Sequence, residues 1–356
     1  MQIEDYGWNL FSPTLETLPT EPVARVASAG GGFYQLITTD GEAEGVLAGR
    51  LRHLADESDG LPAVGDWVTL APRSGPTEMA VIQSVLPRRT KLSRKTAGDR
   101  AMEQLVATNI DLVLVVMGLD GDYSPRRLER FLVMTWESGA LPLVVLNKAD
   151  LLSEGDLANR CQEIEAVAPG VDIVVSSLAQ GRGLDEISSH LLAGRTAALV
   201  GSSGVGKSTL INCLAGGDLQ RTHEVRERDD RGQHTTTRRE LFRLPNGALL
   251  IDNPGIRELQ LWAAGDGLGE AFSDVEELAA GCRFRDCTHL DEPGCAVQAA
   301  VENGVLGSDR LASFHALGRE LASLELRQDV RARRAKERGF GRMIREAVSA
   351  KKRSRR

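Results

Sequence analysis

The sequence predicts a multidomain protein with an N-terminal β-barrel, a central α/β domain and a mostly helical C-terminal domain. The stretch 21–92 contains short strand-like segments separated by turns, without a helix-length amphipathic segment between them. From about residue 109, apolar strands alternate with helix-length segments, which is typical of an α/β domain. After residue 260 the pattern is mostly helical around a Cys/His cluster. A chain of 356 residues is long enough for two or three such domains.

The first domain is predicted to be a small barrel over 21–92, preceded by a loose segment over 1–20 that has little hydrophobic periodicity. Strand-forming residues on both sides of Asp40-Gly41 indicate a hairpin, and AVGDWVTLA and EMAVIQSVLP indicate further strands. An OB-fold is one barrel that this pattern could form. A basic segment follows, with six Lys or Arg between positions 88 and 100.

The central domain, over 93–260, is predicted to contain a parallel sheet with both faces covered. Its apolar runs are DLVLVVMGL, LPLVVLNK, VDIVVSS, TAALVGSS and ALLIDNPG. Helix-length segments separate the first four, over 125–138, 156–168 and 183–192. Strands that are apolar throughout and alternate with helices indicate a parallel sheet that is buried on both sides.

A phosphate-binding loop is predicted between the strand TAALV and the helix that follows it. The loop consists of Gly201, Ser202, Ser203, Gly204, Val205, Gly206, Lys207 and Ser208, with Thr209 next in the helix. It fits the pattern G-x-x-x-x-G-K-[ST] in the strand-to-helix context that this pattern requires. Backbone N–H groups would surround phosphate oxygens, Lys207 would reach the β- and γ-phosphates, and the Ser208 hydroxyl would bind magnesium.

A guanine-binding loop is predicted where the apolar strand LPLVVL ends. Its four residues are Asn147, Lys148, Ala149 and Asp150. Ligands bind at the carboxyl ends of strands in open parallel sheets, and this supports the assignment. The Asp150 carboxylate can accept from both the N1 and N2 hydrogens of guanine, and adenine offers no such pair. Ser176 and Ser177, at the end of VVSS, would supply a backbone contact to the base.

Two further segments would respond to the γ-phosphate. In DNPG, which follows the strand ALLI, Asp252 would hold magnesium through water and the Gly255 N–H would contact the γ-phosphate. In RGQHTTTRR, one threonine should coordinate magnesium, and we favour Thr237 over Thr236. The order of all these parts is cyclically shifted, since the base loops precede the phosphate loop. A parallel sheet tolerates such a shift, because its contacts depend on which strands are neighbours.

The catalytic residues are harder to assign than the binding residues. Lys207 is one candidate through its place at the phosphates. GTPases often carry a water-orienting Gln just after the aspartate-glycine turn, but Ile256 stands there and cannot orient water. The nearest alternative is His234, beside the threonines. An exposed loop histidine without a catalytic role explains His234 equally well.

A metal centre is predicted in the C-terminal domain, over 261–356. Its ligands would be Cys282, Cys287, His289 and Cys295. Three thiolates and one imidazole form a complete tetrahedral set for one structural zinc ion, without an open position for water. Three of the five cysteines in this short stretch favour a metal site in a reducing compartment over a disulfide framework.

Charge is distributed unevenly along the chain. The whole chain carries −7, but residues 331–356 contain 12 Lys or Arg and two acidic residues, a net charge of +10 that leaves −17 for the rest. A basic tail on an acidic body predicts contact with a polyanion, although a merely solvated tail is the alternative. The start, MQIEDYGWNL, lacks the regions of a signal peptide, and no apolar run reaches the roughly 18 residues of a membrane span. We therefore expect a cytoplasmic protein without a membrane partner.

The sequence resembles the RsgA (YjeQ) family of circularly permuted GTPases that act on the small ribosomal subunit. The resemblance covers nearly the whole chain and rests on VGDWV, VLPRRT, NKAD, GSSGVGKSTL, HTTT, DNPG and, above all, CRFRDCTHLDEPGCAV. It implies an OB-fold barrel, a permuted GTPase domain and zinc bound by the four ligands given above. The implied function is late maturation of the small subunit, with hydrolysis of GTP to GDP stimulated by that subunit, and a role for His234. Asn253 departs from the small hydroxyl residue that is more usual there.

Two other functions compete with a ribosome-dependent GTPase. An RNA-binding adaptor could use the nucleotide only as a switch, with negligible turnover, and Ile256 favours this function unless a partner completes the site. A P-loop ATPase or kinase conflicts with Asp150. We expect GTP or GDP, magnesium, zinc and the rRNA of the small subunit as ligands and partners, and a monomer away from the ribosome.

Overall fold

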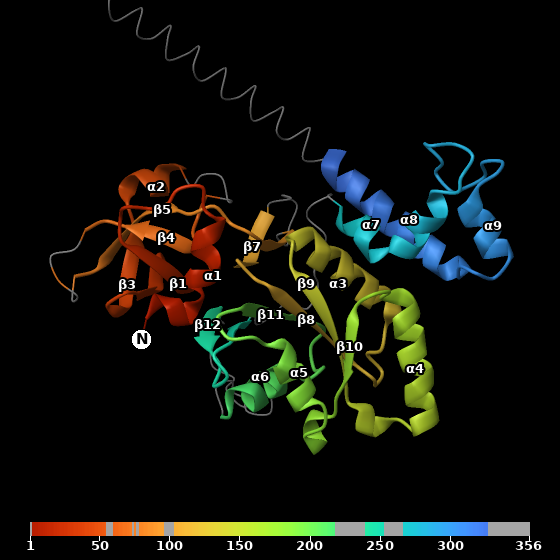
Figure 1. Cartoon of the computed structure of the whole chain (residues 1–356), viewed down its shortest axis with the longest axis horizontal. Coiled ribbons are helices and arrows are strands. Elements are labelled where there is room, and N and C mark those ends of the chain that lie inside the picture. Colours follow the sequence, from red (N-terminus) through yellow and green to blue (C-terminus); the bar gives the residue numbers. More distant parts are fainter. Residues whose placement is uncertain are drawn as a thin grey trace, which may run out of the picture.

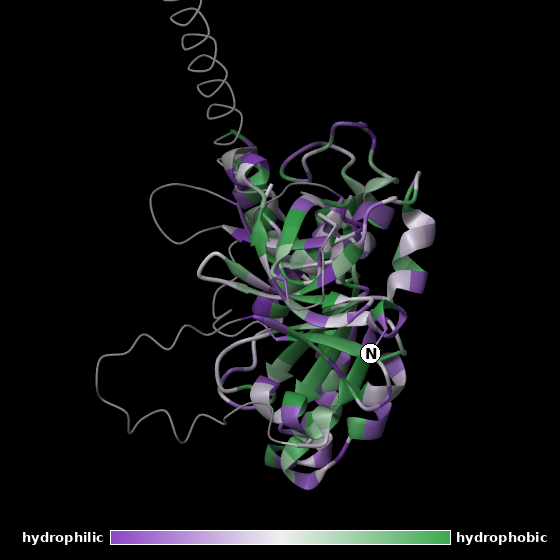
Figure 2. Ribbon diagram, turned by 90° about the vertical axis from the view of Figure 1, so that its left-hand side faces the viewer, coloured by the Kyte–Doolittle hydropathy of each residue, from purple (hydrophilic) through white to green (hydrophobic). Residues whose placement is uncertain are grey.

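The computed structural model describes residues 2–54, 60–72, 75, 78–95, 103–217, 239–252 and 266–326. Figure 1 shows the barrel beside the α/β domain and the C-terminal helices packed along helix α3 (Pro125–Ser138). Hydrophobic residues concentrate on the strands, whereas the helices alternate between hydrophobic and hydrophilic positions (Figure 2). No helix within the described residues is both long and apolar enough to cross a membrane.

Five strands close the N-terminal barrel. They are β1 (Val23–Gly30), β2 (Phe33–Thr38), β3 (Gly41–Leu47), β4 (Trp67–Leu70) and β5 (Ala80–Val85), with the short helix α2 (Gly49–Leu54) between β3 and β4. The strand order β1-β2-β3-β5-β4 is closed by pairing of β4 with β1, and only the β3–β5 pair is parallel. The predicted hairpin is confirmed, because Thr38 of β2 pairs with Gly41 of β3.

The structure differs from the loose segment expected over 1–20. The described part forms η1 (Ile3–Tyr6), α1 (Trp8–Phe11) and η2 (Ser12–Thr14). The Trp8 and Phe11 rings pack on Trp67 of β4, with ring centroids 4.9 and 5.7 Å away. Burying these rings stabilises the segment against the barrel, although elements of three or four residues are too short to produce a periodic pattern.

The central domain contains a sheet of five parallel strands and one antiparallel edge. Its strands are β8 (Leu112–Gly118), β9 (Leu141–Asn147), β10 (Asp172–Val175), β11 (Thr196–Val200), β12 (Glu240–Arg243) and β13 (Leu249–Asp252). The order is β10-β9-β8-β11-β13-β12, with only β12 antiparallel to its neighbour in this domain. Strand β11, which follows the base loops in the chain, therefore lies in the middle of the sheet. The predicted parallel sheet is confirmed.

Helices cover both faces of this sheet, as predicted. They are α3 (Pro125–Ser138), α4 (Glu154–Val167), α5 (Leu184–His190) and α6 (Lys207–Ala215). Alternate residues of β8 enter different cores: Val113 and Val115 pack in the core that contains α3, whereas Leu114 and Val116 pack in the core that contains α6. This alternation explains why the strand is apolar at every position.

The barrel and the central sheet are continuous. Ser28 of β1 pairs with Glu240 of β12, which joins the two into a sheet of 11 strands. A separate hairpin of β6 (Lys91–Lys95) and β7 (Glu103–Thr108) lies between them in the chain, so that the predicted boundary at residue 92 passes through β6. The other predicted domain boundary, at residue 260, falls outside the described residues.

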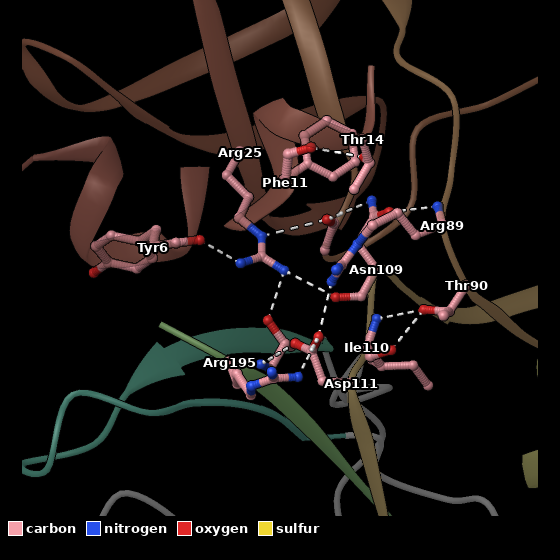
Figure 3. A network of polar contacts seen from close by, with 12 residues as sticks. Tyr6, Phe11, Thr14, Arg25, Arg89, Thr90, Asn109, Ile110, Asp111 and Arg195 are labelled. Atoms are coloured by element: carbon pink, nitrogen blue, oxygen red, sulfur yellow. Dashed lines mark hydrogen bonds and ion pairs between the residues drawn. The ribbon is translucent and has the colours of Figure 1, made fainter. Parts of the chain in front are cut away.

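A buried arginine fixes this junction (Figure 3). Arg25 of β1, only 2% exposed, donates to the carbonyls of Tyr6, Gly65 and Asn109 and to the Thr196 hydroxyl, the last at 2.8 Å. Burial lowers the pKa of Arg25 to about 10, and the guanidinium still carries its charge at neutral pH. One side chain therefore connects the N-terminal segment, the barrel, the linker and the central sheet.

The C-terminal domain packs on α3. Its described helices are α7 (Gly267–Ala271), α8 (Ser273–Ala279), α9 (Ala296–Glu302) and a helix over 308–326. Phe272, Val275 and Leu317 belong to the same apolar core as Leu128 and Leu132 of α3. The core of the α/β domain thus continues into the C-terminal domain, and Figure 1 shows α7 lying along α3.

Candidate functional site

The loops that follow the parallel strands gather at one edge of the sheet, because the carboxyl ends of parallel strands meet there. The edge combines the predicted base loop after β9, the Ser176-Ser177 turn after β10, the phosphate loop after β11 and the end of β13. All predicted nucleotide-binding residues within the described part of the chain therefore lie at this edge, despite their permuted order in the sequence.

Asn147 joins the base loop to the phosphate loop. Its side-chain amide donates to the Val205 carbonyl at 2.8 Å, and its oxygen accepts from the Leu178 N–H at 3.2 Å and the Ser176 hydroxyl at 3.3 Å. Asn147 is 3% exposed, so it supports the two loops from inside the protein and has almost no contact with solvent. An apolar residue here would leave the Val205 carbonyl and the Leu178 N–H without these partners.

The phosphate loop needs glycine at two closely packed positions. Gly201 has φ 144° and Gly206 has φ 104°. A Cβ on Gly201 would overlap the Val116 carbonyl of β8, and a Cβ on Gly206 would overlap the Asn147 amide. Both sites therefore exclude side chains through conformation and through close contact. Gly204 also has a positive φ, but an added Cβ would meet nothing within 4 Å.

Lys207 begins helix α6 and points into the phosphate loop. Its ammonium donates to the carbonyls of Gly201 at 2.7 Å and Ser202 at 2.5 Å. Ser208 is half-buried and Thr209 is exposed in the same turn. The N-terminus of α6 and this ammonium together give the loop a positive potential, which suits a phosphate anion.

The predicted base contacts lie around one turn. The exposed Asp150 accepts from the Ser177 hydroxyl at 2.5 Å, which fixes the orientation of its carboxylate. The Ala149 N–H donates to the Ser176 carbonyl at 3.1 Å. Ser176 and Ser177 are fully buried, and their own backbone N–H groups donate to Leu146 and Arg182 carbonyls. Hydrogen bonds within the protein therefore fix the shape of this turn.

Lys148 has a partner that the sequence analysis missed. Its backbone is left-handed, with φ 66°, and its ammonium lies 2.5 Å from the carboxylate of Asp120. This contact holds the pKa of the Asp120 carboxyl below its usual range. Asp120 follows the carboxyl end of β8, and this position was the available signal, because the other site loops also follow strand ends.

Arg127 is a second residue that the sequence analysis missed. It lies in the first turn of α3, where its guanidinium donates to the Ser202 hydroxyl of the phosphate loop and forms an ion pair of 2.5 Å with Asp122. A basic residue in the first turn of a helix opposes the helix dipole. That mismatch was the sequence signal that Arg127 has a role beyond local helix stability.

The remaining predicted residues of the nucleotide site are only partly described. Asp252, 9% exposed, ends β13 and lies at the same edge of the sheet as the phosphate loop, since β13 pairs with β11. The predicted catalytic His234 and the candidate magnesium ligands Thr236 and Thr237 lie outside the described residues, as does Gly255. Within the described part, a buried carboxylate and the Ser208 hydroxyl fit the oxygen donors that magnesium requires.

The C-terminal cysteines and histidine meet at one point. Sγ of Cys282 and Sγ of Cys295 are 3.8 Å apart, and each lies within 3.6 Å of Nδ1 of His289. The ligand atoms of all four predicted residues, Cys287 included, lie within 4.8 Å of one another. A tetrahedral zinc ion with Zn–S bonds of about 2.3 Å separates its sulfur ligands by about 3.8 Å. The four residues therefore fit one zinc ion.

Glu292 and Gln298 fix the turn that carries His289. The Glu292 carboxylate accepts from the hydroxyl and N–H of Thr288 and from the N–H of Leu290, and these bonds lower the pKa of its carboxyl to about 2. The Gln298 side chain donates to the His289 carbonyl at 2.7 Å. His289 has φ 58°, so that the turn places an imidazole with the help of its neighbours rather than by a regular element.

The chain was compared with known families and proteins. A model of the RsgA GTPase family matches residues 85–262. A small ribosomal subunit biogenesis GTPase RsgA from Syntrophotalea carbinolica is 45% identical over 350 residues, covering 95% of this chain and 94% of that relative. This chain belongs to the RsgA family of GTPases. A relative of the same name from Methanosarcina acetivorans is 41% identical over 92% of this chain and 86% of its own length.

Solved structures agree with this assignment. The crystal structure of YjeQ from Thermotoga maritima superimposes with a TM-score of 0.64 at 27% identity, covering 85% of this chain and 98% of YjeQ. YloQ, described as a circularly permuted GTPase, has the same fold, with a TM-score of 0.61 over 87% of this chain and 98% of YloQ at 24% identity. The permuted order of the motifs in this RsgA-family chain is therefore confirmed.

Proposed function

We propose that this RsgA-family protein hydrolyses GTP to GDP and phosphate during late maturation of the small ribosomal subunit, and that it binds the rRNA of that subunit. The observation that carries the proposal is the Asn147–Val205 hydrogen bond of 2.8 Å, because it joins a guanine-specific loop to a phosphate loop at one edge of the sheet. The small subunit is proposed as the partner because the relatives of this chain are named small ribosomal subunit biogenesis GTPases.

Each part of the site then has a role in binding. Asp150, oriented by Ser177, accepts from the guanine base, and the backbone around Ser176 closes the base pocket. The N–H groups of the loop from Gly201 to Thr209 surround the phosphates. Lys207 exchanges its bonds to loop carbonyls for bonds to phosphate oxygens, so that its charge moves to where negative charge develops.

Magnesium bound with GTP would neutralise phosphate charge during hydrolysis. Ser208, Thr237 (or else Thr236) and Asp252 are the residues proposed to hold it, and Gly255 is proposed to contact the γ-phosphate. His234 is the proposed catalytic residue for the attacking water, since Ile256 cannot orient water. Since the chain lacks the usual water-orienting glutamine, we propose that the small subunit accelerates hydrolysis.

Zinc is proposed to serve structure rather than chemistry. Cys282, Cys287, His289 and Cys295 supply four ligands and leave no position for water. The ion would hold together a loop region that has few apolar residues of its own. The packing of this domain on α3 would then place the zinc site relative to the nucleotide site.

We further propose that the protein is a cytoplasmic monomer away from the ribosome. Its polyanionic partner would be rRNA, contacted by the tail with its 12 basic residues. Three of the cysteines are assigned to a zinc site, which suits a reducing compartment.

Steady-state turnover with and without purified small subunits tests the proposal. We expect slow hydrolysis of GTP alone, faster hydrolysis with small subunits, and loss of both in Lys207→Ala. Co-sedimentation with small subunits should be stronger with a non-hydrolysable GTP analogue than with GDP. Nucleotide-dependent binding without turnover would instead assign the chain as an adaptor that uses GTP only as a switch. ATP competing as well as GTP would exclude the proposed nucleotide.

A further inference from the structure

Helix α3 contacts both the phosphate loop and the C-terminal domain. Its first turn reaches the phosphate loop, where Arg127 donates to the Ser202 hydroxyl. Its remaining turns face the C-terminal domain (Figure 1). A single rigid element of 14 residues therefore lies between the proposed nucleotide site and the proposed zinc-binding domain.

The phosphate-loop end of α3 is built around Arg127. The guanidinium is held by the Asp122 carboxylate at 2.5 Å and by the Asp122 carbonyl at 3.3 Å. On the other side of Ser202, the backbone carbonyl accepts from Lys207 at 2.5 Å. Ser202 is thus held from outside by Arg127 and from inside by Lys207. A phosphate would draw Lys207 away from this carbonyl. Nucleotide binding would therefore change the hydrogen bonds of Ser202, the residue that Arg127 contacts.

The other contacts of α3 hold the C-terminal domain through buried charge. Glu129, 2% exposed, forms an ion pair of 2.9 Å with Arg310, which is 7% exposed. The second guanidinium nitrogen of Arg310 pairs with Asp274 at 2.9 Å and donates to the Ala271 carbonyl at 2.7 Å. Breaking a buried ion pair is strongly destabilising, so the C-terminal domain and α3 should move together.

Two further contacts extend this interface along the helix. Arg130 and Glu320 form two parallel N–H···O bonds, each 2.8 Å long. In the last turn, the Glu137 carboxylate accepts from the Gly267 N–H at 3.0 Å. The first turn also contacts the domain through Arg126, so the C-terminal domain is attached along the whole of α3.

We propose that Arg127 is a positioning residue that couples the phosphate loop to the C-terminal domain through α3. This rests on the proposed function in one respect, namely that the phosphate loop takes GTP. The coupling is reciprocal: if nucleotide biases the position of α3, then fixing the C-terminal domain on a partner changes nucleotide affinity by the same factor. The route runs behind the phosphate loop and does not require residues 253–265.

Hydrogen exchange of the full-length protein tests the coupling without depending on activity. Amide exchange is measured without nucleotide and with a saturating non-hydrolysable GTP analogue, in peptides from 201–216 and 267–279. In the wild type, the analogue should slow exchange in both regions. In Arg127→Met it should still slow exchange in 201–216, while its effect on 267–279 is lost.

Two further variants make the test decisive. Ser202→Ala removes the same hydrogen bond from the other side and should lose the same distant effect, even if Arg127→Met fails to fold. Arg195→Met is the matched control: Arg195 is 50% exposed, compared with 39% for Arg127, and its ion pair with Asp111 has no contact with α3. It should keep both nucleotide effects.

The outcomes separate the coupling from the proposed function. Retention of the effect on 267–279 in either Arg127→Met or Ser202→Ala overturns the coupling. A wild type whose loop is protected but whose 267–279 amides do not respond also overturns it, and leaves GTP binding intact. A wild type in which the analogue protects neither region overturns the proposed function together with the inference.

Discussion

Gly206 of the phosphate loop lies directly against the side-chain amide of Asn147 in the base loop. A Cβ on Gly206 would come closer to this amide than the 3.0 Å that real Cβ atoms essentially never pass. Gly206→Ala should therefore push the two loops apart and lower nucleotide affinity by at least about tenfold, since the hydrogen bond from Asn147 to Val205 would be lost as well. Titration with a fluorescent GTP analogue measures this.

Gly204→Ala is the control for that substitution. Gly204 also has a positive φ, so that alanine costs about 1–2 kcal/mol of backbone strain at either site. Its added Cβ would meet no neighbour within 4 Å. If both variants lost the same affinity, backbone strain alone would explain the result and the Asn147 contact would be irrelevant.

Asp150→Asn should change the specificity of the base pocket. Asparagine places an amide N–H₂ opposite the 2-amino group of guanine, and a mismatched buried pair costs about 1–3 kcal/mol, or roughly 5- to 150-fold in affinity. GTP affinity should fall, whereas xanthosine triphosphate, which carries an oxygen there, should bind more tightly. Asp172→Asn, at the opposite edge of the sheet, should change neither. Unaltered GTP affinity would remove Asp150 from the site.

Cys287→Ala should abolish zinc binding and unfold the C-terminal domain. Structural zinc contributes folding free energy directly, and three remaining ligands leave the tetrahedral set incomplete. The core between the sheet and α6 contains no residue of the C-terminal domain, so the α/β domain should still bind nucleotide. Metal analysis and proteolysis measure both effects, with the exposed Cys213→Ala as control. A wild-type protein that is purified folded and free of zinc would refute the assignment.

His234→Ala should lower turnover in the presence of small subunits by roughly 10²-fold while leaving GTP affinity nearly unchanged. Only interactions made in the transition state are lost, and these affect kcat more than binding. Single-turnover hydrolysis and equilibrium binding separate the two effects. Normal stimulated turnover in the variant would show that His234 is an ordinary loop residue.

Truncation after Val330 should weaken binding to small subunits and flatten its dependence on salt. Each phosphate that a basic residue neutralises steepens the slope of log affinity against log salt by about 0.7–0.9. The truncated protein loses 12 Lys or Arg, while its affinity for free GTP should stay the same. Equal slopes for the two proteins would mean that the tail makes no contact with RNA.

Sequence patterns predicted the elements that are regular and long. Helix α3 occupies the predicted range 125–138, and the apolar runs became parallel strands. Strand β12 was missed because its four residues, ELFR, have charged side chains at both ends and do not form an apolar run, and its pairing with β1 is a tertiary contact. The motifs located the nucleotide and zinc residues, but Asp120 and Arg127 belong to no motif. Their roles follow from which strand ends and helix starts meet in space.

Arg25 has a consequence for the order in which the protein is made. Two acceptors of its guanidinium hydrogen bonds, the Asn109 carbonyl and the Thr196 hydroxyl, are synthesised 84 and 171 residues later. A barrel that emerged alone would hold this cation at its surface without those two acceptors. The barrel leaves the ribosomal tunnel before the central sheet, so its junction is completed only once that sheet has followed it, and the two reach their native state together.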